Sequence, residues 1–135
     1  MNFLGFYIKI YDDREAINTL QENNFCHEKH LISYDLIGNQ LKNCQDDYVV
    51  IMTFGYRPDK IVLKQLLKKK FLYIGMMGSK AKIKKLLTEL EMEGFSKESY
   101  EHIFTPIGLE IFSKTPQEIA ISVAAEIIRE TNREK

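Results

Sequence analysis

The sequence predicts an α/β fold with a mostly parallel sheet, and three observations carry this prediction. Short apolar runs rich in β-branched and aromatic residues recur along the chain, and stretches with helical spacing of apolar residues lie between them. The runs are nearly continuous rather than alternating, which is typical of strands buried on both faces of a parallel sheet. No internal repeat, low-complexity segment or linker interrupts the pattern, so we expect one domain over residues 1–135.

The predicted strands are short. The clearest is Asp47–Thr53 (DYVVIMT), and the first along the chain is Phe6–Tyr11 (FYIKIY). Phe71–Ile74 (FLYI) follows, then a short piece at residues 102–104. A weaker candidate lies at Leu31–Tyr34.

Helical periods separate these strands. Apolar residues at helical spacing predict helices over Arg14–Asn23, Lys60–Lys70 and Lys80–Glu93, and Gly94 ends the third of these. The last helix has the clearest start. Thr115 is a natural N-cap and is followed by a proline at the first helical position and by Glu118, which completes a capping box.

Composition excludes several classes of function. The chain has 135 residues, of which 44% are hydrophobic and 28% charged, as in soluble globular domains. Nineteen basic residues balance nineteen acidic ones, so no net charge attracts nucleic acid or anionic lipid. No apolar run approaches the roughly 20 residues of a membrane span, and the N-terminus lacks signal-peptide features. With Cys26 and Cys44 as reduced thiols, a cytoplasmic protein is expected.

Ligands of open α/β sheets bind beyond the carboxyl ends of the strands, so the residues that follow each strand are the candidate site. Asp12, Asp13 and Arg14 follow the first strand. An acidic residue there either accepts hydrogen bonds from a ribose or caps the next helix, and both interpretations stay open. Thr53 and Gly55 follow the central strand, where a glycine lets backbone approach a ligand or forms a plain loop.

The segment after the third strand gives the strongest physical signal. Gly75, Gly78 and Ser79 precede a helix whose start also carries Lys80 and three further lysines. Backbone N–H groups at a helix N-terminus form an anion site, and cations there are unfavourable unless an anion is held nearby. The alternative is a glycine-rich turn with an ordinary serine cap and solvated lysines. The spacing is not that of a Walker loop.

Two further patterns have competing interpretations. Pro106, Gly108 and Glu110 lie in a loop before the last helix, on which Glu118, Ser122 and Glu126 form a polar row, either a solvated face or the lining of a cleft. Three potential metal ligands, Cys26, His27 and His30, fall within five residues, but no second cluster completes four ligands, so a structural zinc site is not expected.

Taken in order, five motifs resemble the C-terminal domain of the xanthine dehydrogenase accessory family (XdhC/CoxI), over residues 5–128. They are Gly5-Phe6 with IYDDR, Thr53-x-Gly55 with Asp59, YIGxxGSK ending at Lys80, PIGLE ending at Glu110, and TPxEIAxS followed by Ala125-Glu126. The resemblance implies a Rossmann-like three-layer fold, commonly dimeric. It also implies a cytoplasmic accessory protein that binds the molybdenum cofactor (molybdopterin), helps its sulfuration and delivers it to an apo molybdenum hydroxylase such as xanthine dehydrogenase. Such a protein does not itself catalyse the hydroxylation.

The resemblance and the strand ends together predict a set of cofactor-binding residues, with no catalytic residue and no metal ligand. The set is Asp12, Asp13, Arg14, Thr53, Gly55, Gly75, Gly78, Ser79, Lys80, Pro106, Gly108 and Glu110. Four positions depart from the family pattern. Phe54 replaces a histidine, Lys80 an arginine, Glu110 an aspartate, and Phe112-Ser113 a pair of small residues.

The resemblance also indicates that the first strand of the family fold and its glycine-rich loop are lacking. We therefore expect direct pairing of the flanking strands, completion by a homodimer partner, or complementation by an upstream polypeptide. Two other functions stay open. One is an NAD(P)-dependent oxidoreductase, against which the missing glycine fingerprint argues, and the other is a degenerate oligomerisation or interaction remnant.

Overall fold

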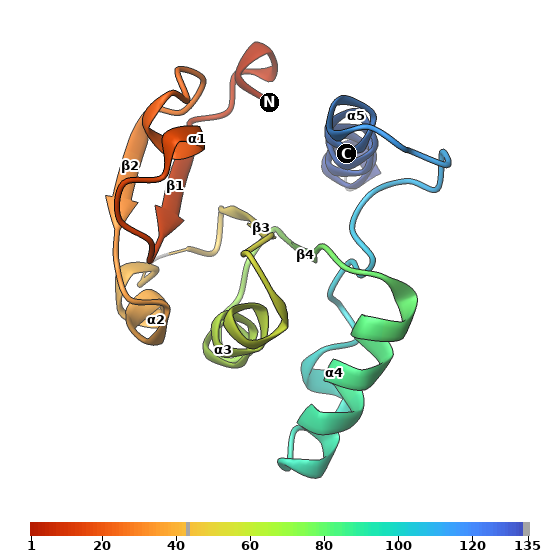
Figure 1. Cartoon of the computed structure of the whole chain (residues 1–135). Coiled ribbons are helices and arrows are strands. Elements are labelled where there is room, and N and C mark those ends of the chain that lie inside the picture. Colours follow the sequence, from red (N-terminus) through yellow and green to blue (C-terminus); the bar gives the residue numbers. More distant parts are fainter. Residues whose placement is uncertain (43, 134–135) are drawn as a thin grey trace. The chain divides into compact units, whose positions relative to one another are not determined.

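A computed structural model describes residues 1–42 and 44–133, and the chain forms two compact units, residues 1–42 and 43–135 (Figure 1). Each unit contains a two-stranded parallel sheet, β1 with β2 and β3 with β4. None of the helices in the described part of the chain is long and apolar enough to cross a membrane. The predicted α/β class is confirmed.

The first unit contains the strands β1 (Lys9–Asp12) and β2 (Glu28–Leu31), joined through the single helical turn α1 (Asn18–Gln21). The 3-10 helix η1 (Asn2–Leu4) precedes them, and η2 (Tyr34–Leu36) and α2 (Ile37–Gln40) follow. The pairing runs from Lys9 opposite Glu28 to Asp12 opposite Leu31.

Two predictions for this unit are wrong in their bounds. The helix expected over Arg14–Asn23 keeps only one turn, since Ala16 takes a left-handed φ of 53° that a helix cannot contain. The second strand lies at Glu28–Leu31 rather than Leu31–Tyr34. Its sequence, EKHL, carries no apolar run because it alternates between half-buried and exposed positions.

The second unit contains β3 (Tyr48–Ile51), α3 (Tyr56–Leu66), β4 (Tyr73–Met76), α4 (Lys80–Met92), η3 (Lys97–Ser99) and α5 (Pro116–Arg133). Strands β3 and β4 pair in parallel, and Phe104 adds a parallel bridge to Gly75 on the other side of β4. The strand expected over residues 47–53 is therefore confirmed at its centre. The strand expected over residues 71–74 lies two residues later, and of residues 102–104 only Phe104 pairs with the sheet. Helix α3 begins four residues before the predicted helix and ends four residues before its predicted end.

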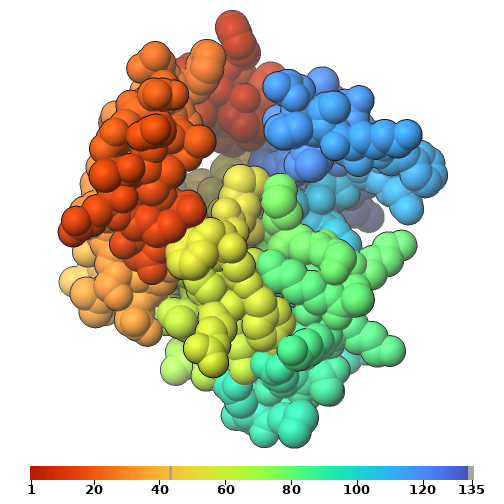
Figure 2. Space-filling model, viewed as in Figure 1, coloured from red at the N-terminus to blue at the C-terminus, as the bar shows by residue number. Residues whose placement is uncertain are grey.

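All four residues of β4 are buried, and helices cover the sheet on both faces. Figure 1 shows α3 and α4 on one face and α5 on the other. Their apolar stripes supply buried side chains to the core of the unit: Leu63 and Leu66 from α3, Leu86 and Leu90 from α4, and Val123 and Ile127 from α5. On the surface, α3 and α4 lie side by side (Figure 2) and are joined by ion pairs from Lys60 to Glu89 and from Lys64 to Glu93.

The predicted boundaries of α4 and the predicted start of α5 are confirmed. The Ser79 hydroxyl caps α4 by accepting a hydrogen bond from the Lys82 N–H at 3.2 Å. Gly94, with a left-handed φ of 94°, follows the last turn of α4. At the start of α5, the Glu118 N–H donates to Thr115 Oγ1, and the Thr115 N–H donates to the Glu118 carboxylate at 3.0 Å.

Candidate functional site

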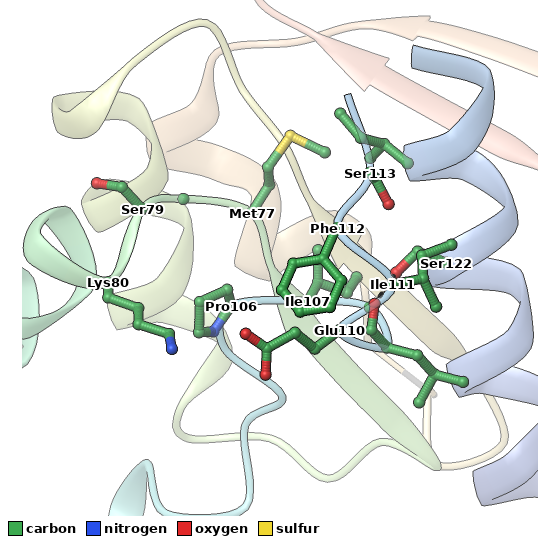
Figure 3. A pocket seen from close by; sticks show the side chains of 14 residues that line it. Met77, Ser79, Lys80, Pro106, Ile107, Glu110, Ile111, Phe112, Ser113 and Ser122 are labelled. Atoms are coloured by element: carbon green, nitrogen blue, oxygen red, sulfur yellow. Dashed lines mark hydrogen bonds between the residues drawn. The ribbon is translucent and has the colours of Figure 1, made fainter. Parts of the chain in front are cut away.

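Two of the predicted site segments meet in one groove of the second unit. Residues 77–80, between β4 and α4, form one wall, and the loop of residues 106–113, before α5, forms the other (Figure 3). Ile119 and Ser122 of α5 complete the lining of a groove of about 610 Å³. The groove brings together half of the predicted site residues: Gly78, Ser79, Lys80, Pro106, Gly108 and Glu110.

The wall at the start of α4 is positive. No acidic residue lies in the first turn of this helix, and the helix dipole adds partial positive charge where Ser79 caps it. Among the residues that the structure describes, Lys80 has no ion-pair partner, and its exposed side chain lines the groove. This end of the groove therefore favours an anionic group.

The neighbouring lysine has an internal partner instead. The Lys82 ammonium lies 2.5 Å from the carboxylate of Asp59, a residue only 1% exposed. That carboxylate also accepts hydrogen bonds from the Thr53 N–H at 2.9 Å and from the Thr53 hydroxyl at 2.6 Å. The three residues tie the end of β3 to the starts of α3 and α4. Lys85 in turn lies over the Tyr56 ring, 5.0 Å from its centroid.

The opposite wall is anchored to α5 by two buried polar side chains. The Glu126 carboxylate accepts hydrogen bonds from the Gly108 N–H at 2.9 Å and from the Tyr73 hydroxyl at 2.6 Å. Burial and the bond to Glu126 raise the pKa of Tyr73, so it remains a donor. One turn earlier, the Ser122 hydroxyl donates to the Leu109 carbonyl at 2.5 Å. Of the polar row of α5, Ser122 therefore lines the groove and Glu126 holds its loop, whereas Glu118 is exposed.

Gly108 allows the close approach of this loop to α5. Its φ is 99°, in the left-handed region, and a Cβ atom there would lie 2.4 Å from the Ser122 hydroxyl oxygen. The Thr105–Pro106 peptide bond just before it is cis.

Three predicted residues of the same unit do not line the groove. Gly75 lies inside β4, and a Cβ atom there would come within 2.6 Å of the Ile107 side chain, so the glycine allows loop and strand to pack. Thr53 uses its hydroxyl on Asp59, as described above, and on the carbonyl of Gly55 at 3.2 Å. Asp59 belongs to the second motif of the family resemblance, but no local pattern predicted its burial or its bonding partners.

The other three predicted residues lie in the first unit. The carboxylate of Asp12, at the end of β1, accepts from the Arg14 guanidinium at 3.0 and 2.9 Å, and Arg14 lowers the pKa of this carboxyl. The alternative in which Asp12 or Asp13 caps the next helix is wrong, because the N-cap of α1 is Ile17.

The potential metal ligands of this unit are engaged by neighbouring groups. His27 Nδ1 accepts a hydrogen bond from the Ile8 N–H at 2.9 Å, and His30 lies 2.7 Å from the Glu28 carboxylate. Over the described ranges, 1–42 and 44–133, no group of three or more His, Cys, Asp or Glu side chains could hold a metal ion.

Comparison with known proteins identifies the family. The model of the XdhC Rossmann domain matches residues 1–127. The chain belongs to this family. The match covers both compact units.

Two curated relatives and one solved structure extend the comparison. The chain is 32% identical over 130 residues to the uncharacterized protein YqeB of Escherichia coli K12, covering 96% of this chain. It is 36% identical over 87 residues, 64% of this chain, to a probable xanthine dehydrogenase subunit of Bacillus subtilis 168. A crystal structure described as a xanthine dehydrogenase from Bacillus halodurans superposes with a TM-score of 0.83 at 29% identity, over 99% of this chain. Two of these three proteins are thus described as a xanthine dehydrogenase or a subunit of one.

The chain spans only part of each of these proteins. It covers 24% of the length of each curated relative and 38% of the crystallised chain. The shared part is the Rossmann-like domain described above.

Proposed function

We propose that this XdhC domain binds the molybdenum cofactor and assists the maturation of a xanthine dehydrogenase-type molybdenum hydroxylase, with no turnover of its own. The observation that carries the proposal is the meeting of the Ser79-Lys80 turn with the loop of residues 106–113 in one groove. Its partner would be the apo-hydroxylase that receives the cofactor.

The chemistry of the groove fits a pterin that bears a phosphate. Lys80 and the N–H groups at the start of α4 offer charge and donors to the phosphate. Apolar side chains such as Met77, Ile107 and Phe112 offer surface for a planar ring system. When bound, the cofactor carries the molybdenum redox chemistry that the target hydroxylase uses.

The residues of the chain bind and orient rather than react. Lys80 holds the anionic end of the ligand by charge. Ser122 and Glu126 of α5 anchor the loop wall through hydrogen bonds with the Leu109 carbonyl and the Gly108 N–H. A groove that binds its ligand by charge and by a fixed apolar wall, without a covalent bond, suits a carrier that has to release the cofactor again.

The test is retention of the cofactor. The purified chain is incubated without oxygen with molybdenum cofactor freshly released from a molybdenum enzyme, then passed through gel filtration. Bound pterin is oxidised to its fluorescent form and quantified, and molybdenum is measured by mass spectrometry. We expect the wild-type chain to retain both. Lys80→Gln should lower the retained amount about five-fold, a typical effect of one partly exposed charge on a phosphate.

The matched control is Lys84→Gln. It removes the same charge from the same helix at an exposed position outside the groove, so retention should stay near that of the wild type. The proposal fails if the wild-type chain retains no pterin, or if both lysine variants lose it equally. The second outcome would show that only the net charge matters.

A further inference from the structure

Phe112 has two energetically unfavourable features in the folded chain, an exposed ring and a left-handed backbone. Its side chain is 83% exposed, although burial of a phenylalanine is strongly favourable. Its backbone has a φ of 58°, in the left-handed region that is unfavourable for a bulky residue. Strained, exposed residues of this kind gather at binding sites, where the strain serves the function.

Contacts on both sides of Phe112 hold this conformation. The Ile111 N–H donates to the Leu109 carbonyl at 2.9 Å before it. After it, the Ser113 hydroxyl contacts the Glu118 carbonyl at 3.4 Å, and the Lys114 N–H donates to the Glu118 carboxylate at 2.5 Å. Because the loop is anchored at both ends, the ring is held out of the apolar core and against the groove.

The ring lies at the centre of the groove lining. In Figure 3 it stands between the side chains of Glu110 and Ser113, in front of Ile107, with Lys80 beyond Glu110. An aromatic face presented in this way can stack on a second flat ring.

Glu110 supplies a complementary polar group beside the ring. Its exposed side chain lines the groove, and it has no ion-pair partner within the described residues. An ionised carboxylate only accepts hydrogen bonds. It therefore suits a ring edge that carries N–H donors and disfavours an edge that carries only carbonyl oxygens.

We propose that Phe112 stacks on the ring of the bound ligand and that Glu110 accepts hydrogen bonds from its amino edge, so that the groove selects a 2-amino-4-oxo-pteridine. The inference rests on the proposed function and assigns the ring end of the same groove. Guanine shares the amino–oxo edge on a smaller ring system, so the test compares both sources of this chemistry.

The test uses small probes without phosphate or metal, so that it reads the ring end alone. Pterin is compared with lumazine, which has an oxygen in place of the 2-amino group, and with guanosine. Binding to the full chain is followed by ligand-detected NMR, and for the two pteridines also by the quenching of fluorescence that stacking causes. We expect the wild-type chain to prefer pterin over lumazine about ten-fold, the effect of one charge-assisted hydrogen bond.

Three variants separate the two contacts. Phe112→Leu keeps the apolar bulk but removes the aromatic face, and we expect pterin affinity to fall about five-fold with loss of quenching. Glu110→Gln should abolish the preference for pterin over lumazine while quenching persists. Phe95→Leu, at the opposite end of α4 from Ser79, is the aromatic control and should bind like the wild type. Unfolding midpoints confirm that each variant is folded.

Several results would overturn the inference: equal affinity for pterin and lumazine in the wild type, stronger binding of guanosine than of pterin, no binding of any probe, or unchanged quenching in Phe112→Leu. The proposed function fails separately. If the chain retains the molybdenum cofactor in a Lys80-dependent way while the probes give any of these overturning results, only the ring assignment is wrong. If the cofactor is not retained at all, the proposed function itself falls.

Discussion

Replacing Gly108 by alanine tests whether the groove loop depends on its close approach to α5. Two glycines of the second unit share nearly the same left-handed backbone, Gly108 with φ 99° and Gly94 with φ 94°. A Cβ atom at Gly94 would meet nothing within 4 Å, whereas one at Gly108 would lie 2.4 Å from the Ser122 Oγ and 3.4 Å from its backbone carbon. Gly94→Ala therefore measures the backbone cost alone.

The expected costs follow from these distances. Placing alanine at positive φ costs about 1 kcal/mol, and we expect this value for Gly94→Ala. In Gly108→Ala the Ser122 hydroxyl has to rotate away and lose its hydrogen bond to Leu109, which adds about 1 kcal/mol. Overlap with the remaining atoms of Ser122 adds about 1 kcal/mol or more, since the helix cannot recede freely. The total for Gly108→Ala is about 3 kcal/mol.

The assay is urea unfolding of both variants, of Ser122→Ala and of the Gly108→Ala/Ser122→Ala double variant. In the Ser122→Ala background, Gly108→Ala should cost less than in the wild type, because the hydroxyl oxygen that it displaces is gone. If Gly108→Ala and Gly94→Ala lower the free energy of unfolding equally, within about 0.5 kcal/mol, the close approach is not what requires a glycine there.

Two further predictions concern charged groups. Asp59→Asn removes the charge that pairs with Lys82 and weakens the acceptor of the Thr53 hydrogen bonds. In urea unfolding it should therefore lower the free energy of unfolding by about 3 kcal/mol. The control Asp46→Asn, at an exposed position, should have little effect. Backbone N–H groups of Lys114 and Thr115 lower the pKa of Glu118 below its usual 4.5, so its stabilising contribution is present above that pH and is lost as the pH falls through the lower, folded-state pKa. Thermal melts between about pH 6 and pH 3 should therefore show a weaker loss of stability with acid for Glu118→Gln than for wild type, and parallel curves would contradict this assignment.

The second unit could be predicted from its sequence because local signals and tertiary packing agree there. Its strands are apolar runs buried on both faces, and its long helices begin at recognisable caps, such as Ser79 and the Thr115–Glu118 box. The first unit lacks this agreement. Its second strand is mostly polar, and its helical period is interrupted at Ala16, where only the backbone conformation reveals the break. The expected homodimer, the cytoplasmic location and the single domain stay predictions.

The candidate site was predictable to the extent that it follows strand ends. The turn before α4 and the loop before α5 meet as the topology of parallel strands requires, so Ser79, Lys80 and Glu110 share one groove. Long-range polar pairs were not predictable in the same way. Glu126 and Asp59 both belong to motifs of the family resemblance, but no local pattern identifies their partners, which lie 53 and 23 residues away. The exposure of Phe112 depends on a loop conformation that local sequence patterns do not predict.

From the bond between Tyr73 and Glu126 we infer an order of events during folding. Residues 48–92 contain β3, α3, β4 and α4, whose contacts are local and form quickly. The loop wall of the groove needs the Glu126 carboxylate, which lies 18 residues beyond Gly108 in the sequence. Glu126 also has to reach Tyr73 of β4, from which it is separated by 53 residues. On the ribosome, we therefore expect the groove to be among the last parts of the domain to form. Until α5 emerges, the face of the sheet that it covers remains open to chaperones and to unwanted association.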